Sequence, residues 1–462
     1  MFLRTGSAAD RLPRARHRVA AAIFLLCLVT APAGFGQEPQ LPLEVLTDTA
    51  AGRTARPIDP TQGISASDLI RRALASNAEL QAARLQIERA RARLTQASLR
   101  PNPSLDFEQH NGVMNTPGER ATFVGVSYPI EPGGKRGRRI DLARAELEAA
   151  RADVADRERK LANAVYSILA EALAAARELE ITAKQDAIDT QGVRVVEARV
   201  SEGDAAPLEM NLLRVELERL RSRRVLVAGK LQAAIFRLKA LSGIPADEPL
   251  KFREVLASAA LHQPPGTLEA AIEIALKTRP DLRLARLEEE SAQAGLKLAR
   301  AESVPNITVS AKYGVTQSTF DSTPFGSLTD RDRIFSVGVS IPLPLFNRNQ
   351  GGKAEAEASI TQTARRREFI EQMVRAEVAG AWVRYEAAGA AIRNFEEGVL
   401  KRASDNIRTV RGAYEAGAFR INELLLEQRR LLDAEREYTE ALAERYRSLA
   451  DLQAAIGTPE KQ

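Results

Sequence analysis

The sequence predicts a mainly α-helical protein with a small β part, built from two copies of one half-protein. Three observations support this fold class. A series of residues recurs in the same order in both halves of the 462-residue chain. Two proline-free spans, residues 133–206 and 345–458, consist largely of strong helix formers. Four short segments alternate apolar and polar residues, which is the pattern of β-strands.

The composition excludes several classes of function. Apolar residues make up 44% of the chain and charged residues 27%, which indicates an ordered protein. One Cys and three His rule out a Cys₄ or Cys₂His₂ zinc site and argue against a thiol-redox enzyme. The formal net charge is +5, but residues 1–33 carry five Arg and one Asp, so the rest carries about +1. This balance gives no support to nucleic-acid binding.

Residues 1–33 are predicted to form a secretory signal peptide that is removed from the mature protein. Basic residues precede an apolar run at residues 19–29, and small residues end the segment. The alternative, a membrane anchor, needs about 20 apolar residues. Cys27 follows Leu26 rather than the small residue of a lipid-anchor site, so it is expected to leave with the signal peptide. The following segment, residues 34–64, is expected to be extended.

The duplication sets the predicted domain organisation. Residues 73–105 match residues 275–307 at an offset of 202. Residues 124–130 match residues 337–343 at an offset of 213. Gly203 and Gly243 match Gly417 and Gly457 at an offset of 214. The growing offset places an insertion of about ten residues between the strands of the second copy. We therefore expect repeats at residues 65–242 and 267–457, a linker at 243–266 and a tail at 458–462.

Each repeat is predicted to contain a helix, a strand pair, a very long helix, a bend and another long helix. In the first repeat the hairpin is expected at about 104–129 and the long helices at about 136–202 and 205–242. In the second repeat the hairpin is expected at about 306–342 and the long helices at about 350–416 and 419–457. A helix from 138 to 200 would be roughly 95 Å long at 1.5 Å per residue. Helices alone would equally describe an elongated coiled-coil protein.

The strand pairs argue against a purely coiled-coil protein. In residues 306–316 the odd positions from Ile307 to Val315 are apolar, and most even positions are polar. Strict alternation over about ten residues is the signature of a transmembrane β-strand, although a soluble hairpin has the same pattern. Two hairpins cannot close a barrel, and lipid does not tolerate an open sheet edge. Transmembrane strands would therefore have to be completed by other subunits.

A glycine-rich corner follows each hairpin. Residues 130–139 contain Gly133-Gly134-Lys135, and residues 346–353 contain a second Gly-Gly-Lys. Neither corner has the full phosphate-binding P-loop pattern, so glycine is expected only to permit the turn from strand to helix. The basic side chains of these corners are expected either to reach lipid headgroups or to lie in a solvated loop. They are Lys135, Arg136, Arg138, Arg139 and Arg348.

These features together resemble the TolC-type outer-membrane efflux factors. The corner Ile130-Glu131-Pro132-Gly133-Gly134-Lys135-Arg136-Gly137 is similar to the IE-x-GGKRG corner of the cobalt–zinc–cadmium (CzcC-like) members. The segment PLPLFNRNQG at residues 342–351 is also characteristic of them. The resemblance covers residues 65–457, nearly the whole mature chain.

The resemblance implies a homotrimer in the bacterial outer membrane. Each subunit would contribute four transmembrane strands to one closed β-barrel, and the long helices would form an α-barrel tunnel in the periplasm. The chain would be a passive export duct, completing a tripartite pump with a periplasmic adaptor and an inner-membrane RND transporter. Heavy-metal cations are the expected cargo. A drug or organic-compound duct, or a coiled-coil scaffold without a pore, remains the alternative.

The resemblance implies no enzyme, and neither catalytic residues nor a cofactor nor a nucleic-acid partner is expected. His110 is expected in a surface loop and His262 in the linker. Neither has neighbours at metal-ligand spacing, so no metal site is expected.

The resemblance also implies two tight turns at the periplasmic tip, where the adaptor would dock. Gly203 and Asp204 lie in the first turn, and Gly417 and Arg420 in the second. Glycine is suited to such turns because it adopts backbone conformations closed to other residues. Ordinary helix-hairpin loops are the alternative.

Glu423 matches the position where many members carry an Asp that lines the pore constriction. The family often repeats the acid one turn later, but this chain has Leu426 there. Glu427 follows at i+4 on about the same helix face and would extend the acidic ring. The opposing expectation is a surface ion pair between Glu423 and Arg420 or Arg430.

Overall fold

The computed structural model describes residues 57–111, 119–256, 266–323 and 326–457. The chain divides into residues 1–54 and a unit of residues 55–462, and everything below refers to that second unit. The predicted signal peptide at residues 1–33, the predicted tail at 458–462 and His262 lie outside the described residues.

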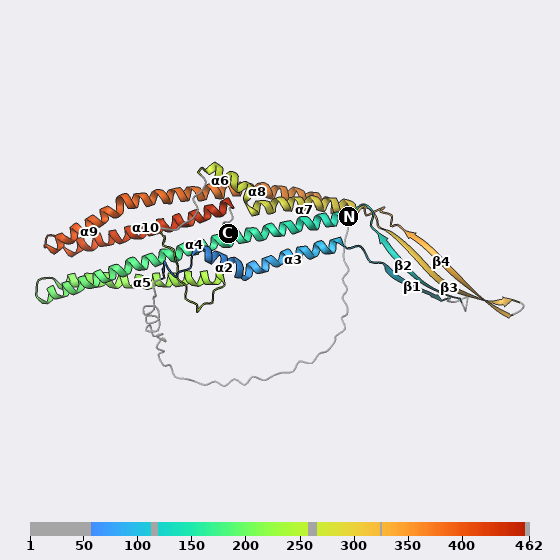
Figure 1. Ribbon diagram of the computed structural model, residues 1–462, viewed down its shortest axis with the longest axis horizontal. Coiled ribbons are helices and arrows are strands. Elements are labelled where there is room, and N and C mark those ends of the chain that lie inside the picture. Colours follow the sequence, from blue (N-terminus) through green and yellow to red (C-terminus); the bar gives the residue numbers. More distant parts are fainter. Residues whose placement is uncertain (1–56, 112–118, 257–265, 324–325, 458–462) are drawn as a thin grey trace, which may run out of the picture. The chain divides into compact units, whose positions relative to one another are not determined.

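The two halves contain the same order of elements (Figure 1). The first half comprises α2 (Ala66–Ser76), α3 (Ala78–Ser98), β1 (Ser104–Asn111), β2 (Arg120–Ile130), α4 (Lys135–Ser201) and α5 (Pro207–Ser242). The second half comprises α6 (Leu268–Thr278), α7 (Pro280–Glu302), β3 (Ile307–Thr323), β4 (Gly326–Ser340), α8 (Gln350–Asn394), the π-helical turn η2 (Phe395–Val399), α9 (Leu400–Glu415) and α10 (Ile421–Ile456).

The first helix of each half is broken into two, which the sequence reading did not anticipate. In the first half Asn77 ends α2, and its side chain accepts a hydrogen bond from the Leu80 amide to cap α3. In the second half Pro280 is the first residue of α7, where its missing N–H costs nothing. Pro280 also biases Arg279 towards extended backbone, so the chain cannot continue as one helix.

Equivalent contacts close both halves and support the duplication. Ser76 donates its hydroxyl to the Ser242 carbonyl at 2.7 Å, and Thr278 donates to the Ile456 carbonyl at 2.7 Å. One residue later, Asn77 donates to the Leu241 carbonyl at 3.1 Å, whereas Arg279 donates to the Ala455 carbonyl at 3.3 Å. These side chains satisfy carbonyls that the ends of α5 and α10 leave without helical partners.

The long helices are close to the expected lengths. Helix α4 runs for 67 residues without a break. Its counterpart in the second half runs from Gln350 to Glu415 but contains the π-helical turn η2, which the sequence did not predict. None of the helices in the described ranges combines the length and apolar composition that crossing a bilayer requires.

The four strands form one antiparallel sheet in the order β1-β2-β3-β4. Strands β3 and β4 have 17 and 15 residues, compared with 8 and 11 for β1 and β2, which accommodates the expected insertion. Beyond Gln317, which pairs with Arg120, the β3–β4 hairpin continues without β2. All four strands join helix ends at one end of the helices, those of α3, α4, α7 and α8 (Figure 1).

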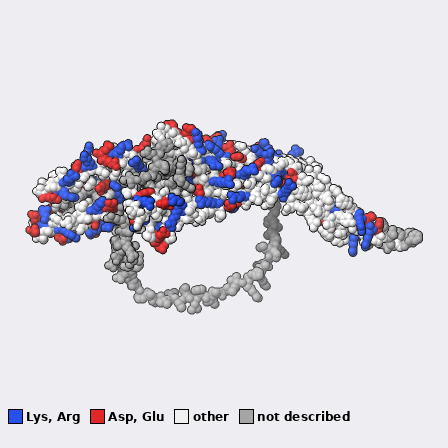
Figure 2. All heavy atoms as spheres, in the orientation of Figure 1, with Lys and Arg blue, Asp and Glu red and all other residues white. Residues whose placement is uncertain are grey.

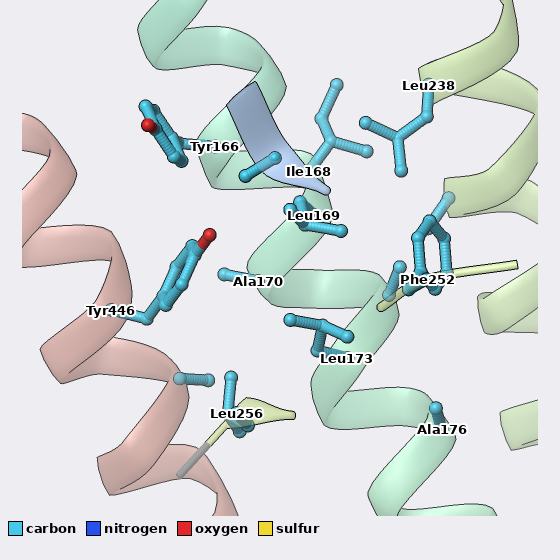
Figure 3. Packing of buried hydrophobic residues seen from close by; sticks show 14 of the residues in the cluster. Tyr166, Ile168, Leu169, Ala170, Leu173, Ala176, Leu238, Phe252, Leu256 and Tyr446 are labelled. Carbon is cyan, nitrogen blue, oxygen red and sulfur yellow. The ribbon is translucent and has the colours of Figure 1, made fainter. Parts of the chain in front are cut away.

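The largest buried cluster lies where α2, α4, α5 and α10 meet the segment that follows α5 (Figure 3). Phe252 of that segment is fully buried and packs with Leu169 and Leu238. It also bridges the extended residues Ile58 and Ile64 in parallel pairings. The segment preceding α2 is therefore held against the linker between the halves.

A buried ionic cluster joins the two halves near the end of α10. Arg279 is 2% exposed and donates to both carboxylate oxygens of Asp281, at 2.9 and 2.5 Å, and to Glu377 at 2.6 Å. Arg159 of the first half lies 3.7 Å from Asp281 and donates to the Ala454 carbonyl at 2.9 Å. Burial alone would raise the pKa of Asp281, but the hydrogen bonds and charge of Arg279 outweigh it and lower the pKa.

Candidate functional site

The sheet has one apolar face, built by rows of side chains that cross all four strands. One row is Leu105, Val126, Ala311 and Val337, and the next is Phe107, Val124, Tyr313 and Phe335. Successive side chains of a strand point to opposite faces, so residues two apart share a face and the rows stack. The apolar alternation expected for residues 306–316 is present in the structure.

This apolar face is exposed in the single chain. Phe107, Phe335 and Val337 are 66%, 70% and 67% exposed, against 7% or less for most core residues. In Figure 2 the surface over most of the sheet is white, and charged side chains gather near the end that adjoins grey residues. A continuous apolar surface of this kind marks a contact with lipid or another protein.

The opposite face of the sheet is polar. Lys312 forms an ion pair with Glu108 across the sheet and covers Gly125, where a Cβ would lie 2.5 Å from the Lys312 Cγ. Ser127, Ser310 and Gly338 form a neighbouring row. One aromatic ring, Phe123, lies over Gly314 on this face. The sheet therefore has one apolar face and one mainly polar face.

The sheet has two free edges among the described residues. The outer edges of β1 and β4 pair with no strand of the described ranges. A sheet edge presents unpaired N–H and C=O groups, which is costly wherever water is excluded. If the apolar face lies in a membrane, strands of other chains must complete the sheet.

The structure places the basic corner residues in different surroundings. Lys135 is only 7% exposed and donates to Asn306 at 2.5 Å, so its ammonium faces the protein, which fits neither of the two alternatives given for the corner residues. Arg136 donates to the Ser98 carbonyl, and Arg348 to the Pro344 carbonyl. Arg138 lies 3.6 Å from Asp141, within α4. These three remain exposed and accessible to a lipid surface.

Arg139, the fifth basic side chain of these corners, is tied to the protein. It makes a bidentate pair with Glu131 at 2.7 and 2.8 Å, across the turn from β2 to α4. Such a forked pair fixes the geometry of the corner.

Two turns at the other end of the long helices share one geometry. Gly203 and Gly417 have φ angles of +81° and +76°, the left-handed region that favours glycine. The Asp204 amide donates to Arg199, and the Ala418 amide donates to Ala413, both at 2.8 Å. Each turn is a Schellman motif, which satisfies the last carbonyls of α4 and α9.

The structure places the two turns at the same end of the helices, as the resemblance implied, and shows how they pack on each other. A buried apolar cluster unites residues of α4, α5, α9 and α10 next to the turns: Val196, Leu213, Ile407, Ile421, Leu424 and Leu425. Across it, Tyr414 donates to Glu209 at 3.3 Å, and Arg199 lies over the Tyr414 ring at 6.0 Å. The apolar spacing of the four helices was visible in the sequence, but their mutual packing was not.

The charged turn residues face outwards. Asp204 is 72% exposed and accepts a hydrogen bond from the Arg199 guanidinium at 3.3 Å. Arg420 is exposed and precedes the first residue of α10. Both are therefore accessible to a partner at this end of the helices.

Glu423 and Glu427 lie in the first turns of α10 but differ in their partners. Glu427 pairs with Arg430 at 2.5 Å and is 12% exposed. Glu423 is exposed and makes no side-chain hydrogen bond or ion pair with any described residue. The alternative ion pair of Glu423 with Arg420 or Arg430 is therefore absent among the described residues.

A buried carboxyl, Asp189, lies on α4 towards the same end of the helices. Asp189 is only 7% exposed, and its side chain accepts a hydrogen bond from the Gln185 side chain at 2.7 Å. Burial raises the pKa of Asp189 to about 6, and the nearby charges of Asp186 and Glu216 add to the increase. The sequence did not single out this residue, because an aspartate in a helix is normally solvated.

The structure also corrects the position of His110. It lies in strand β1 opposite Ala121, not in a loop, because β1 extends to Asn111. Within the described ranges there is no group of three or more His, Cys, Asp or Glu residues that could hold a metal ion.

A sheet with one exposed apolar face and with edges that are unpaired among the described residues, joined to paired long helices, fits the class of outer-membrane export channels. The chain belongs to the outer membrane efflux protein family, whose model matches residues 69–244 and 271–458. The members of this family are transport channels and not enzymes.

Two curated relatives and one solved structure show the range of similarity. The cobalt-zinc-cadmium resistance protein CzcC of Cupriavidus metallidurans is 25% identical over 83% of this chain and 88% of its own length. The nickel and cobalt resistance protein CnrC of the same organism is 27% identical over 62% of this chain and 65% of its own. A crystal structure of CusC, solved in work on its folding and transmembrane channel formation, superposes on this chain with a TM-score of 0.72. The two sequences are 21% identical, and the match covers 88% of this chain and 98% of the CusC chain.

Proposed function

We propose that this protein is the outer-membrane duct of a tripartite RND-type efflux system and exports heavy-metal cations. In this proposal three chains assemble into one barrel in the outer membrane, and their long helices extend into the periplasm. The single observation that carries the proposal is the four-stranded sheet, which is apolar on one face and polar on the other and whose two edges pair with no strand of the described residues.

The dimensions of the apolar face suit a bilayer. The apolar side chains of β3 extend from Ile307 to Val315, about 27 Å along a strand at about 3.4 Å per residue. With a tilt of about 40°, this length corresponds to about 20 Å along the membrane normal, close to the ~25 Å apolar band of outer-membrane barrels. The polar face would then line the lumen.

The number of strands supports three chains rather than two. The described part of each chain supplies four strands. An eight-stranded barrel is filled by its own side chains, so two chains would leave no duct. Twelve strands from three chains give a wider barrel with an even number of strands. A homotrimer is thus the smallest assembly of this sheet that can conduct solutes.

The helix turns support docking of a partner in the periplasm. Each half carries the same Schellman motif between its two long helices, packed on one apolar cluster, with Asp204 and Arg420 exposed. We propose that Gly203, Asp204, Gly417 and Arg420 form the surface that binds the periplasmic adaptor, through which the inner-membrane transporter delivers cargo. Glu423 and Glu427 would line the constriction next to these turns.

The proposed cargo rests on the relatives. CzcC and CnrC are described as resistance proteins for cobalt, zinc, cadmium and nickel. A passive duct does not need to bind its cargo, and an acidic constriction would favour cations. A deletion strain should become sensitive to these metals and regain resistance from a plasmid copy. Sensitivity to organic solvents or drugs, with normal metal resistance, would identify an organic cargo instead.

A matched pair of substitutions tests the barrel. Val309 lies on the apolar face, opposite Val339, and Ser310 points to the polar face. A charge on the lipid face costs about 2–4 kcal/mol near the membrane midplane for a cation, and less for an acid or nearer to the membrane boundary. Val309→Asp should therefore reduce the amount of trimer in the outer-membrane fraction more than Ser310→Asp. Equal amounts of trimer for both variants would contradict the assignment of the faces.

A further inference from the structure

The apolar face of the sheet ends in a basic cluster that the proposed function does not use. Beyond the aromatic row, the next row on that face is Gln109, Thr122, Val315 and Arg333, and the following one is Asn111, Arg120, Gln317 and Arg331. Three arginines, Arg120, Arg331 and Arg333, thus lie on the face that carries Phe107 and Phe335. They lie at the end of the sheet remote from the helices.

The charges of strand β4 are sorted by face. Residues 330–333 read Asp-Arg-Asp-Arg, and alternate side chains of a strand point to opposite faces. Asp330 and Asp332 pair with Ser318 and Thr316, so both aspartates lie on the polar face. Arg331 and Arg333 lie on the apolar face, away from these two carboxylates. The positive charge of this cluster is therefore not neutralised by the acids beside it in sequence.

The three guanidinium groups lack anionic partners within the described ranges. Arg331 donates to the Gln317 side chain at 3.3 Å, which is a neutral contact. None of the three forms an ion pair with a described carboxylate, although most arginines of the helices do. All three are exposed. Five N–H donors of Arg120 and of Arg333, and the four of Arg331 that do not bind Gln317, are thus available to an external anion.

The spacing fits a phosphate-bearing headgroup. Arg120 and Arg331 flank Gln317 on neighbouring strands, so their Cα atoms lie about 10 Å apart, and Arg333 is two residues further along β4. Two long guanidinium side chains can converge on one phosphate or hold two adjacent phosphates. The aromatic row next to them, with Phe107, Tyr313 and Phe335, provides the interfacial belt against which acyl chains pack.

We infer that Arg120, Arg331 and Arg333 bind the phosphate groups of a phosphorylated glycolipid in the outer leaflet of the outer membrane. This inference rests on the proposed function, because the sheet must lie in that membrane with its helices in the periplasm. The cluster then lies at the outer boundary of the apolar band, at the level of the headgroups. The glycolipid would bridge the apolar rows and the arginines, which a free phosphate cannot do.

Lipid binding by the purified full-length trimer tests the inference. The probes are bis-phosphorylated lipid A and the same lipid with both phosphates removed, titrated in detergent and followed by native mass spectrometry. The neutral variant is Arg120→Gln/Arg331→Gln/Arg333→Gln. Two matched controls are the corresponding triple Lys variant, which keeps the charge, and Asp330→Asn/Asp332→Asn on the opposite face.

The wild-type trimer should bind the bis-phosphorylated lipid at least about tenfold more tightly than the dephosphorylated one, because charge-assisted hydrogen bonds are lost with the phosphates. The Gln variant should lose this preference, the Lys variant should keep most of it, and the Asn variant should be unchanged. A millimolar excess of inorganic phosphate should not displace the lipid. Rising salt should weaken the preference.

Three results would overturn the inference: a wild-type trimer without preference, a Gln variant with wild-type preference, or full displacement of the lipid by inorganic phosphate. The first result is measured on the wild-type protein, so it would contradict the inference even if every variant misfolded. If the wild-type chain forms no trimer in the outer membrane, the proposed function fails as well. If the trimer conducts ions but lacks the lipid preference, only the inference fails.

Discussion

Glu423 and Glu427 share a helix face but differ in their ion pairs. Glu427 pairs with Arg430, whereas the Glu423 carboxylate has no partner among the described residues. In the proposed trimer three Glu423 carboxylates would form a negative ring that attracts divalent cations. Glu423→Ala should therefore weaken the block of single-channel current by a divalent cation several-fold and reduce cation selectivity. Planar-bilayer recordings of the purified trimer, with and without the cation, measure both effects.

Glu427→Ala provides the matched control for this measurement. Arg430 already neutralises Glu427 at 2.5 Å, so its removal should change the block much less. Unchanged block in Glu423→Ala, or a larger effect in Glu427→Ala, would show that Glu423 does not line the constriction.

The buried Asp189 predicts a stability that depends on pH. Its pKa is raised to about 6 by burial, whereas the unfolded chain ionises near 3.8. As the pH rises from about 4 to 6, the Asp189 carboxyl ionises in the unfolded chain but stays largely protonated in the folded one. Ionisation therefore lowers the free energy of the unfolded state alone, and the protein loses stability. About two pH units correspond to at most about 3 kcal/mol per chain, and this cost persists above pH 6. Asp189→Asn should therefore be more stable than the wild type at pH 7.

The difference between Asp189→Asn and the wild type should disappear below about pH 4, where the wild-type carboxyl is protonated in both states. Thermal unfolding of both proteins from pH 4 to pH 8 measures it. A difference in melting temperature that stays constant over this range would mean that the substitution acts through packing, not through ionisation.

At the scale of the elements, the two Schellman turns make a specific prediction. A Cβ at Gly203 or Gly417 would meet no atom within 4 Å, so a substitution there strains only the backbone. A β-branched residue at positive φ costs about 1–2 kcal/mol. Gly203→Val or Gly417→Val should alter the turn and abolish efflux while the barrel remains inserted. Efflux assays combined with membrane fractionation of the variants measure the two effects separately.

Gly412 offers the control for the turn variants. It lies inside α9, also has free space around its Cβ position, and has no positive φ. Gly412→Val should therefore leave both efflux and insertion intact. Normal efflux by the two turn variants, together with an intact adaptor complex, would contradict the docking role of the turns.

The sequence predicts regular elements well where one period dominates a long span. The ends of the long helices lie within one or two residues of the expected positions, because glycines and prolines mark them. The breaks at Asn77 and Arg279 were missed, although Pro280 and the cap at Asn77 were visible signals. The π-helical turn at 395–399 has no such signal, since its residues are compatible with an ordinary helix.

The candidate site is less predictable than the fold, because its properties depend on partners distant in sequence. The alternation in β3 was enough to predict two faces of the sheet. Lys135 is buried against Asn306, which lies 171 positions further along the chain. Tyr414 contacts Glu209, which is 205 positions away in the sequence. Local patterns carry no information about such pairs.

At the scale of the whole molecule, the ionic cluster around Arg279 organises the end of the second half and contacts the first half through Arg159. Removing this guanidinium would leave Glu377 without its partner, Asp281 with Arg159, at 3.7 Å, as its ion-pair partner, and the Ala455 carbonyl without its donor. Loss of one partner from a buried ion pair costs about 3–5 kcal/mol. Arg279→Ala should therefore lower the thermal stability of the purified protein strongly, as measured by its melting temperature.

The first half supplies the control for this prediction. Asn77 occupies the equivalent position and donates a neutral hydrogen bond to Leu241, besides capping α3. Its replacement by Ala should cost about 1–2 kcal/mol. If Asn77→Ala destabilises the protein as much as Arg279→Ala, the charges of the cluster contribute nothing beyond the shared backbone contact.

In the proposed assembly, the paired turns would also determine how many copies of a partner can bind. Each chain carries two turns with the same backbone hydrogen bonds, so the proposed trimer presents six of them. Their side chains differ, with Arg199 and Asp204 at one turn and Phe419 and Arg420 at the other, so the two kinds alternate around the threefold axis. A partner that recognises the backbone would bind in six copies, and one that recognises the side chains in three. The stoichiometry of the assembled pump therefore reports which of the two surfaces is recognised.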